Sequence, residues 1–219
     1  MRIPDFLVGQ VFEPLWDRYE SSIRLRTLAE LRKSQWLPRQ ELQERADEKL
    51  ARIVRHAAGQ CPLYAERFAA AGIDPERVAS IADLAGLPLL TKTDVRDRAE
   101  DLFACDHRRE DLVAAKTGGS TGVALNIWCD RRGVQRRAAA ALRGDEWSGW
   151  RLGQPMAAVW GNPPRAETWK TRLRYALKDR VIYLDTMRID DAAIGAVLHG
   201  YKTRVAVMPK NGVEHGLEA

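Results

Sequence analysis

A run of glycine and hydroxyl residues between two short apolar segments constrains this chain more than any other feature. The run Thr117–Gly122 contains three glycines and three hydroxyl side chains, and Lys116 precedes it. The segment 112–115 is apolar, and 124–128 alternates as a β-strand does, so the run is predicted to be a loop that joins two strands. Glycines let backbone N–H groups turn inward and hydroxyls add donors, which suits a phosphate. An ordinary flexible hairpin loop is the alternative interpretation.

Two other phosphate-binding loops do not match this run. The Walker A pattern requires a lysine directly after its last glycine, and Val123 follows Gly122. The dinucleotide pattern requires glycines two positions apart, and Ser120 and Thr121 stand two places after Gly118 and Gly119. Neither a P-loop nor a nicotinamide-dinucleotide fold is therefore predicted.

The residues before the loop have helical periodicity. Apolar positions recur at spacings of three and four from Asp5 to about Gln60, which predicts two helices separated by Pro38. Cys61–Tyr64 is expected to end the second helix, and a further short helix is expected to follow up to Ala71. Thr91 followed by an acid three residues later predicts the capped start of a helix that runs to about residue 101.

After the loop, strand and helix patterns alternate. Helices are expected at about 131–147, 167–178 and 191–199, the first capped by Asp130, and strands at 156–160 and 181–184, with a turn at 161–164. Such alternation predicts an α/β fold. We therefore expect a helical lead-in over 1–86, a partial α/β domain that contains the loop over 87–205, and a polar tail of unclear structure over 206–219.

Composition narrows the class of protein. Of the 219 residues, 45% are hydrophobic and 30% are charged, which indicates a folded globular chain. The longest uncharged stretches have 13 residues, fewer than the roughly 20 apolar residues of a membrane span, so no membrane partner is expected. No secretory leader is recognised near the N-terminus. The three separate cysteines suggest reduced thiols, and a cytoplasmic location is expected.

The net charge of +5 is unevenly distributed. Residues 1–110 carry 18 basic and 19 acidic side chains, whereas residues 111–219 carry 17 and 11. An excess of positive charge around the loop favours an anionic ligand, although solvated basic faces would give the same count. Aromatic residues do not alternate with basic ones as a base-stacking surface requires, so nucleic acid is not an expected partner.

The loop resembles the T-[SG]-G-[ST]-T-G-x-P motif of adenylate-forming enzymes, in particular the branch with phenylacetate-coenzyme A ligases and CapK-like proteins. Gly118 stands where Ser is usual, and Ala124 stands where Pro is usual. Three other stretches resemble the same branch over roughly residues 40–202, namely Cys61–Phe68, Ile81–Arg96 and Trp147–Gly153. Five residues match the motif position by position, namely Thr117, Gly119, Ser120, Thr121 and Gly122, and together with Gly118 they are the candidate phosphate-binding residues.

The resemblance implies an ATP-dependent acyl-adenylating ligase. In that family the loop holds the β- and γ-phosphates of ATP with Mg²⁺ while a carboxylic acid attacks the α-phosphate, and coenzyme A then displaces AMP. Thr117, Ser120 and Thr121 would donate hydroxyl hydrogen bonds, and the glycines would donate backbone N–H groups. Lys116 has no counterpart in the motif and is interpreted as a solvated lysine at a strand end.

Parts of the family pattern are not recognised in this chain. No adenine-binding segment, ribose-binding acid or C-terminal catalytic lysine is found, and Lys210 lies in unrelated surroundings. We therefore expect the N-terminal part of such a ligase, with catalytic residues unknown, and association with a second chain that covers exposed sheet edges. The open alternative is a non-catalytic nucleotide- or phosphate-binding module, or a structural interaction module.

A few other residues carry chemistry. Trp147, Trp150 and Trp160 either line an acyl pocket or pack in the core. Cys105-Asp106-His107 offers metal-ligand side chains, but without a second pair no metal site is predicted. His56 and His199 fall in helices without a nucleophile nearby and are interpreted as structural. Four arginines follow the loop, namely Arg131, Arg132, Arg136 and Arg137. They are interpreted as a solvated face. In the alternative interpretation, one of them contacts a phosphate or the coenzyme.

Overall fold

The computed structural model describes residues 3–116, 125–160, 168–174, 180–185, 195 and 206–209. The chain divides into two compact units, and each is treated by itself below. Unit 1 comprises residues 1–31 and 135–219, and unit 2 comprises residues 32–134. Helices predominate in the described part, with two small sheets, which is compatible with the predicted α/β class. The domain boundaries expected after residues 86 and 205 stay predictions.

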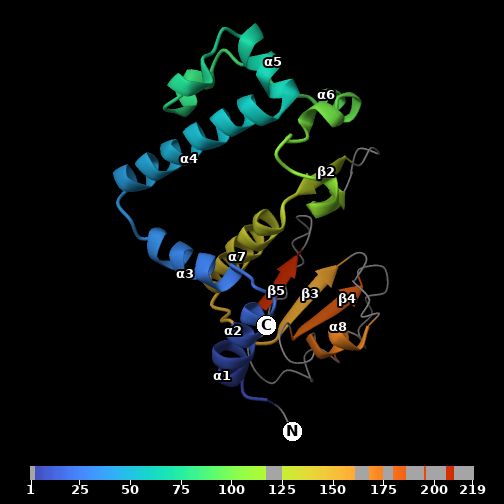
Figure 1. Ribbon diagram of the computed structural model, residues 1–219. Coiled ribbons are helices and arrows are strands. Elements are labelled where there is room, and N and C mark those ends of the chain that lie inside the picture. The colour runs from blue at the N-terminus through green and yellow to red at the C-terminus, as the bar shows by residue number, and fades with distance from the viewer. Residues whose placement is uncertain are drawn as a thin grey trace. The chain divides into compact units, whose positions relative to one another are not determined.

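Figure 1 shows the helices and strands along the chain. The helices are α1 Asp5–Leu7, the π-helical segment η1 Val8–Phe12, α2 Glu13–Tyr19, α3 Arg24–Ser34, α4 Arg39–Gln60, α5 Pro62–Ala70, α6 Lys92–Asp97, α7 Arg131–Trp147 and α8 Trp169–Arg174. Short 3₁₀ turns are η2 Pro75–Arg77, η3 Ile81–Leu84, η4 Glu100–Leu102 and η5 Arg109–Asp111. The strands are β1 Val113–Lys116, β2 Asn126–Cys129, β3 Met156–Trp160, β4 Val181–Asp185 and β5 Ala206–Pro209.

The helical prediction for the N-terminal sixty residues is confirmed except for one break. The chain leaves the helix after Tyr19 and re-enters it at Arg24, so three helical stretches replace the two expected. Ser21 adopts a left-handed backbone with φ 52°, and Ser22 N–H donates to the Asp17 carbonyl at 2.7 Å. No glycine or proline marks this turn, and periodicity alone therefore missed it.

Buried ion pairs hold the turn between α2 and α3 in unit 1. The Arg24 guanidinium pairs with the carboxylates of Glu13 and Asp17, and its distance to the latter is 2.9 Å. Asp17 also accepts from the Leu25 N–H at 3.1 Å and so satisfies a free donor at the start of α3. Burial lowers the pKa of Arg24, but the two carboxylates outweigh it and the net direction is upward. The arginine therefore stays charged between its partners.

The core of unit 2 forms between α4, α5 and the turns that follow. Val54, Phe68 and Val78 are its buried centre. Leu50, Ala58, Tyr64, Ile73, Leu84 and Leu87 pack around it. This cluster fixes α4 against the segment that leads to the hairpin.

The predicted cap at Thr91 is confirmed. The Thr91 hydroxyl accepts from the Asp94 N–H at 3.1 Å, and the Asp94 carboxylate accepts from the Thr91 N–H at 2.8 Å. This reciprocal pair begins α6, which ends at Asp97 rather than at about residue 101. A second capping box joins Ser80 and Asp83 at the start of η3.

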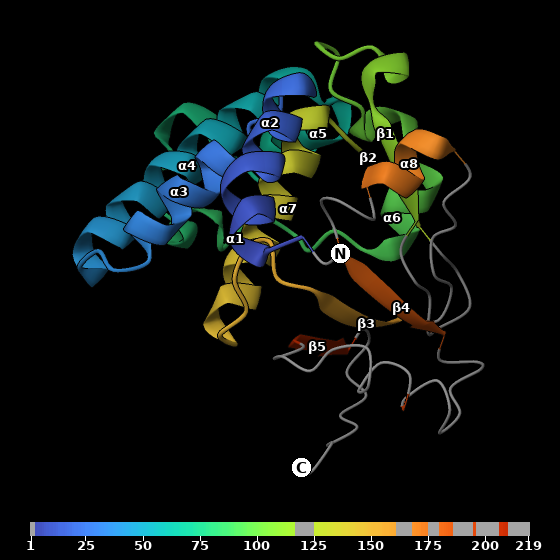
Figure 2. The same ribbon diagram turned by 90° about the horizontal axis from the view of Figure 1, so that it is seen from below.

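Unit 1 contains a parallel sheet of strand order β4-β3-β5. Met156 pairs with Val181 on one side and with Ala206 on the other. Figure 2 shows β3 beside β4, with β5 at its other edge. The strands β3 and β4 were predicted. The polar-tail interpretation did not predict β5, because residues 206–209 are too few to carry a clear strand pattern.

Several predicted elements reach beyond the described residues. The turn at 161–164 and most of the helix at 191–199 lie outside them, and of the helix at 167–178 the described part is α8. Among the described helices, none combines the length and the apolar character that a membrane crossing needs.

A close backbone approach in unit 1 joins the N-terminal helix to the turn before β3. A Cβ built on Gly9 would lie 2.3 Å from the Leu152 carbonyl oxygen, and one on Gly153 would lie 2.5 Å from the Asp5 oxygen. Gly153 also has φ +94°, where glycine is favoured. Arg180 ties the same region together, because its guanidinium reaches Asp5 at 2.7 Å and the Gly153 carbonyl at 2.8 Å.

The close contact between the backbones at Gly9 and Leu152 predicts that Gly9→Ala destabilises the protein. The added methyl group meets backbone atoms that cannot rotate away, and overpacking of this kind costs about 1–3 kcal/mol. Gly144→Ala is the matched control, because Gly144 lies within α7 and a Cβ added there meets no atom within 4 Å. It should raise the free energy of unfolding by about 0.5–1 kcal/mol, the difference in helix propensity. Urea unfolding followed by circular dichroism measures both, and equal stability of the two variants would contradict the contact.

Candidate functional site

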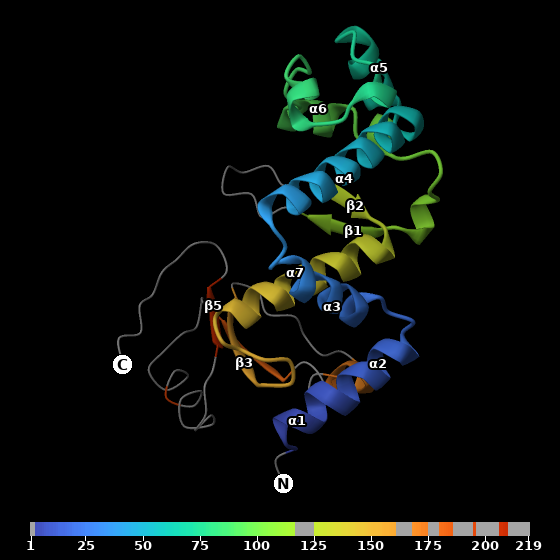
Figure 3. The same cartoon turned by 90° about the vertical axis from the view of Figure 1, so that its left-hand side faces the viewer.

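The glycine-rich run connects the two strands of an antiparallel hairpin, as predicted. Val113 pairs with Cys129, and the ladder ends at the pair Lys116 and Asn126 (Figure 3). The run therefore starts directly after the last paired residue of β1. The six candidate phosphate-binding residues lie outside the described residues, as does the Lys116 side chain. They are Thr117, Gly118, Gly119, Ser120, Thr121 and Gly122.

An aromatic and cationic stack supports the hairpin within unit 2. The Phe103 and Trp128 rings lie with their centroids 5.6 Å apart and their planes tilted by 49°. The Arg109 guanidinium lies 4.1 Å from the centroid of Phe103 and 5.8 Å from that of Trp128. Glu100 forms an ion pair with Arg109 and so holds it in place. Cation–π contacts of this kind position a β2 side chain on the segment before β1.

Charges at the entrance of the hairpin are paired with one another. Arg108 contacts Asp111 and Glu110, each at 3.0 Å. The hydrogen bond from Arg108 lowers the pKa of the Asp111 carboxyl, which is therefore ionised at neutral pH. Both described arginines before β1, Arg108 and Arg109, therefore have acidic partners.

The exit of the hairpin leads directly into α7. The Asp130 carboxylate accepts a hydrogen bond from the Gly133 N–H, so the predicted cap is confirmed. Arg131, Arg132, Arg136 and Arg137 are exposed, as the interpretation of a solvated basic face expects. This helix start is the most basic described segment next to the loop.

The three tryptophans do not combine into a pocket in the described part of the chain. Trp150 is buried and donates its indole N–H to the Gln154 carbonyl at 3.0 Å, which is a core role. Trp147 is 66% exposed and carries the Arg143 guanidinium 4.8 Å from its ring centroid. The Trp160 side chain and His199 lie outside the described residues.

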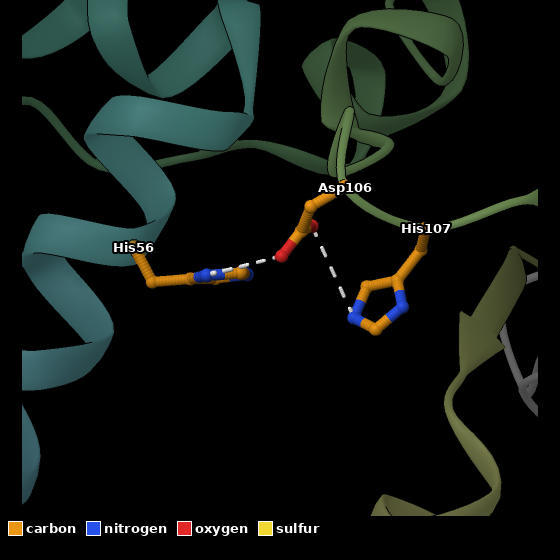
Figure 4. Close-up of side chains that lie close together, drawn as sticks. All are labelled: His56, Asp106 and His107. Atoms are coloured by element: carbon orange, nitrogen blue, oxygen red, sulfur yellow. Dashed lines mark ion pairs between the residues drawn. The ribbon is translucent and has the colours of Figure 1, made fainter.

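One group of side chains was missed by sequence reasoning. His56 on α4 lies next to Asp106 and His107, which follow η4 (Figure 4). No local pattern joins these residues, because about fifty positions separate the first from the others. Their proximity depends on how α4 packs in unit 2.

No family model matches the chain. Part of the chain is nevertheless similar to curated phenylacetate-coenzyme A ligases. The one from Aromatoleum evansii is 31% identical over 115 residues, or 52% of this chain and 26% of that enzyme. The one from Thermus thermophilus is 29% identical over 126 residues, or 57% of this chain and 28% of that enzyme.

A third relative has a similar identity and a similar coverage. The phenylacetate-coenzyme A ligase of Pseudomonas putida is 31% identical over 108 residues, which is 45% of this chain and 25% of that enzyme. These similarities support a relationship to adenylate-forming ligases. The aligned part spans about a quarter of the length of these relatives.

The stack of Phe103, Trp128 and Arg109 predicts that Phe103→Ala loosens the β1–β2 hairpin. Loss of the ring removes the contacts to Trp128 and Arg109 and costs about 1–2 kcal/mol. Hydrogen exchange of the β1 and β2 amides should become faster while the core of α4 and α5 stays protected. Phe6→Ala is the control, because that ring is 71% exposed. Equal exchange of the hairpin amides in both variants would show that Phe103 does not hold it.

Proposed function

We propose that this chain carries the phosphate-binding part of an ATP-dependent acyl-adenylating ligase, as the N-terminal part of such an enzyme. The overall reaction joins a carboxylic acid to ATP, giving an acyl-adenylate and pyrophosphate, and then transfers the acyl group to coenzyme A as a thioester. The observation that carries the proposal is the hairpin β1–β2, whose last pair, Lys116 and Asn126, flanks the segment that contains the motif Thr117–Gly122. The partial similarity to phenylacetate-coenzyme A ligases supports it.

The loop contributes hydrogen-bond donors in this proposal. Thr117, Ser120 and Thr121 donate their hydroxyl groups, and Gly118, Gly119 and Gly122 donate backbone N–H groups to the phosphate oxygens. Donors of this kind neutralise the charge that grows on the departing pyrophosphate. Mg²⁺ bound together with ATP would help to neutralise the same charge.

The substrate class follows the relatives. An aryl or fatty carboxylic acid is proposed as the acyl donor, since the similar enzymes are named for phenylacetate. The CapK-like branch is the other proposed affiliation within the family. A cytoplasmic location is also proposed, in which the cysteines Cys61, Cys105 and Cys129 would stay reduced.

A non-catalytic phosphate-binding module is the second candidate. The described residues include the strands on either side of the loop, whereas the similarity spans about a quarter of the relatives. The same loop would then bind a nucleotide without adenylating an acid. Formation of pyrophosphate separates the two candidates.

Association with a second chain remains part of the proposal. In the described sheet of unit 1, β4 and β5 are the outer strands, and an uncovered strand edge favours pairing with another chain. A mass in solution above that of one chain, measured by light scattering, is the expected result. A strict monomer across the accessible concentrations would contradict it.

The phosphate role predicts that Ser120→Ala/Thr121→Ala weakens ATP binding. Each lost hydrogen bond to a charged group is worth about 1.5–3 kcal/mol, so the double variant should bind MgATP at least tenfold more weakly. Calorimetric titration measures the affinity. Thr93→Ala is the control, because it makes the same change at an exposed position of α6. Equal affinity in all three proteins, or no binding by the unchanged chain, would overturn the phosphate role.

Pyrophosphate release tests the chemistry separately. The ligase proposal expects release that depends on both ATP and an aryl or fatty acid. ATP binding without acid-dependent release, measured beside a full-length relative that does release pyrophosphate, would favour the phosphate-binding module instead.

A further inference from the structure

Two histidines and one aspartate meet on the surface of unit 2, away from the adenylating motif in sequence. Nδ1 of His56 lies 3.8 Å from one Asp106 carboxylate oxygen, and Nε2 of His107 lies 4.0 Å from the other. The two imidazole rings are inclined at 61° with their centroids 6.5 Å apart. Figure 4 shows both rings turned toward the carboxylate between them.

The backbone brings these residues together without help from their side chains. His56 is on α4, whose Val54 and Ala58 belong to the core of unit 2. One turn later, the Gln60 carbonyl accepts a hydrogen bond from the Cys105 N–H at 2.8 Å. This bond fixes the segment that carries Asp106 and His107 against the end of α4. The cluster is therefore built on a scaffold that is already held in place.

The spacing of the three side chains differs from that of a hydrogen-bonded pair. Distances of 3.8 and 4.0 Å exceed the roughly 2.7–3.2 Å of an N–H···O bond. One ligand atom from each residue lies within 4.8 Å of the other two. An ion at the centre of such a triangle is at most about 2.8 Å from each atom, and small side-chain rotations reduce this to the roughly 2.0–2.2 Å of zinc–ligand bonds.

The side chains have the freedom to make this adjustment. His56, Asp106 and His107 are between 40% and 44% exposed, so they can rotate and water can reach the centre. The three residues offer two imidazole nitrogens and one carboxylate oxygen as ligand atoms.

We propose that His56, Asp106 and His107 bind one divalent transition-metal ion, with Zn²⁺ as the ion whose ligand preference they match. Two imidazoles and one carboxylate suit Zn²⁺ and similar first-row ions, whereas Mg²⁺ prefers oxygen ligands throughout. Water fills the remaining coordination positions. The ion would join the end of α4 to the segment before the hairpin and so stabilise unit 2.

The test uses the full chain, freed of metal by a chelator, and Zn²⁺ alone as the probe. Calorimetric titration is expected to show one saturable site, and the melting temperature should rise with Zn²⁺. His56→Ala, His107→Ala and Asp106→Asn should each weaken binding at least tenfold and remove the rise in melting temperature. Mg²⁺ in excess should leave the Zn²⁺ affinity unchanged.

Two variants serve as controls for binding elsewhere. The chain has four histidines, so His199→Ala makes the same substitution outside the cluster and should bind Zn²⁺ as the unchanged chain does. Cys105→Ser removes the adjacent exposed thiol and should also retain binding. On addition of Zn²⁺, the imidazole ¹⁵N signals of two of the four histidines should shift. One of these two sets of signals should be missing from the His56→Ala spectrum, and the other should be missing from the His107→Ala spectrum.

Three outcomes would overturn the proposal. One is the absence of saturable Zn²⁺ binding by the unchanged chain. Another is unchanged affinity in both His56→Ala and His107→Ala, which would leave the cluster as a surface ion pair. The third is loss of binding in Cys105→Ser with full binding in His56→Ala, which would place the ion on the thiol. Circular dichroism of Asp106→Asn, which keeps the side-chain shape, separates loss of a ligand from loss of the fold.

Discussion

The pairing of β1 with β2 is the constraint on which the candidate site depends. It brings together Lys116 and Asn126, the residues that flank the segment with the glycine-rich run, through the backbone pairing of the two strands. A shift of this register by one residue would turn Trp128 to the other face of the hairpin and away from Phe103. The stack of Phe103, Trp128 and Arg109 therefore favours the observed register of the two strands.

The described charged side chains differ between the two ends of this hairpin. Arg108 and Arg109 at the entrance are paired with acids, and the exposed arginines at the exit belong to α7. Long-range attraction from the basic second half of the chain favours an anion, and in the proposed site the hydroxyl and backbone donors of the run make the close contacts.

Much of the fold could be predicted because its signals are local. The caps at Thr91 and Asp130 and the strands around the glycine run each depend on residues a few positions apart. The break at Ser21 could not be predicted, because it is held by Arg24 bound between the carboxylates of α2. The strand β5 could not be predicted either, because four residues become a strand only when β3 is available as a partner.

The sequence by itself determined most of the described helices and strands and the position of the glycine-rich run between two of them, and it predicts which residues of that run would contact a phosphate. Tertiary structure alone decided which distant residues meet. His56 reached Asp106 and His107 through the packing of α4, and Gly9 met Gly153 because two backbones approach too closely for a side chain. Local patterns encode backbone preference over a few residues, whereas contacts across a hundred positions arise only when a core is formed.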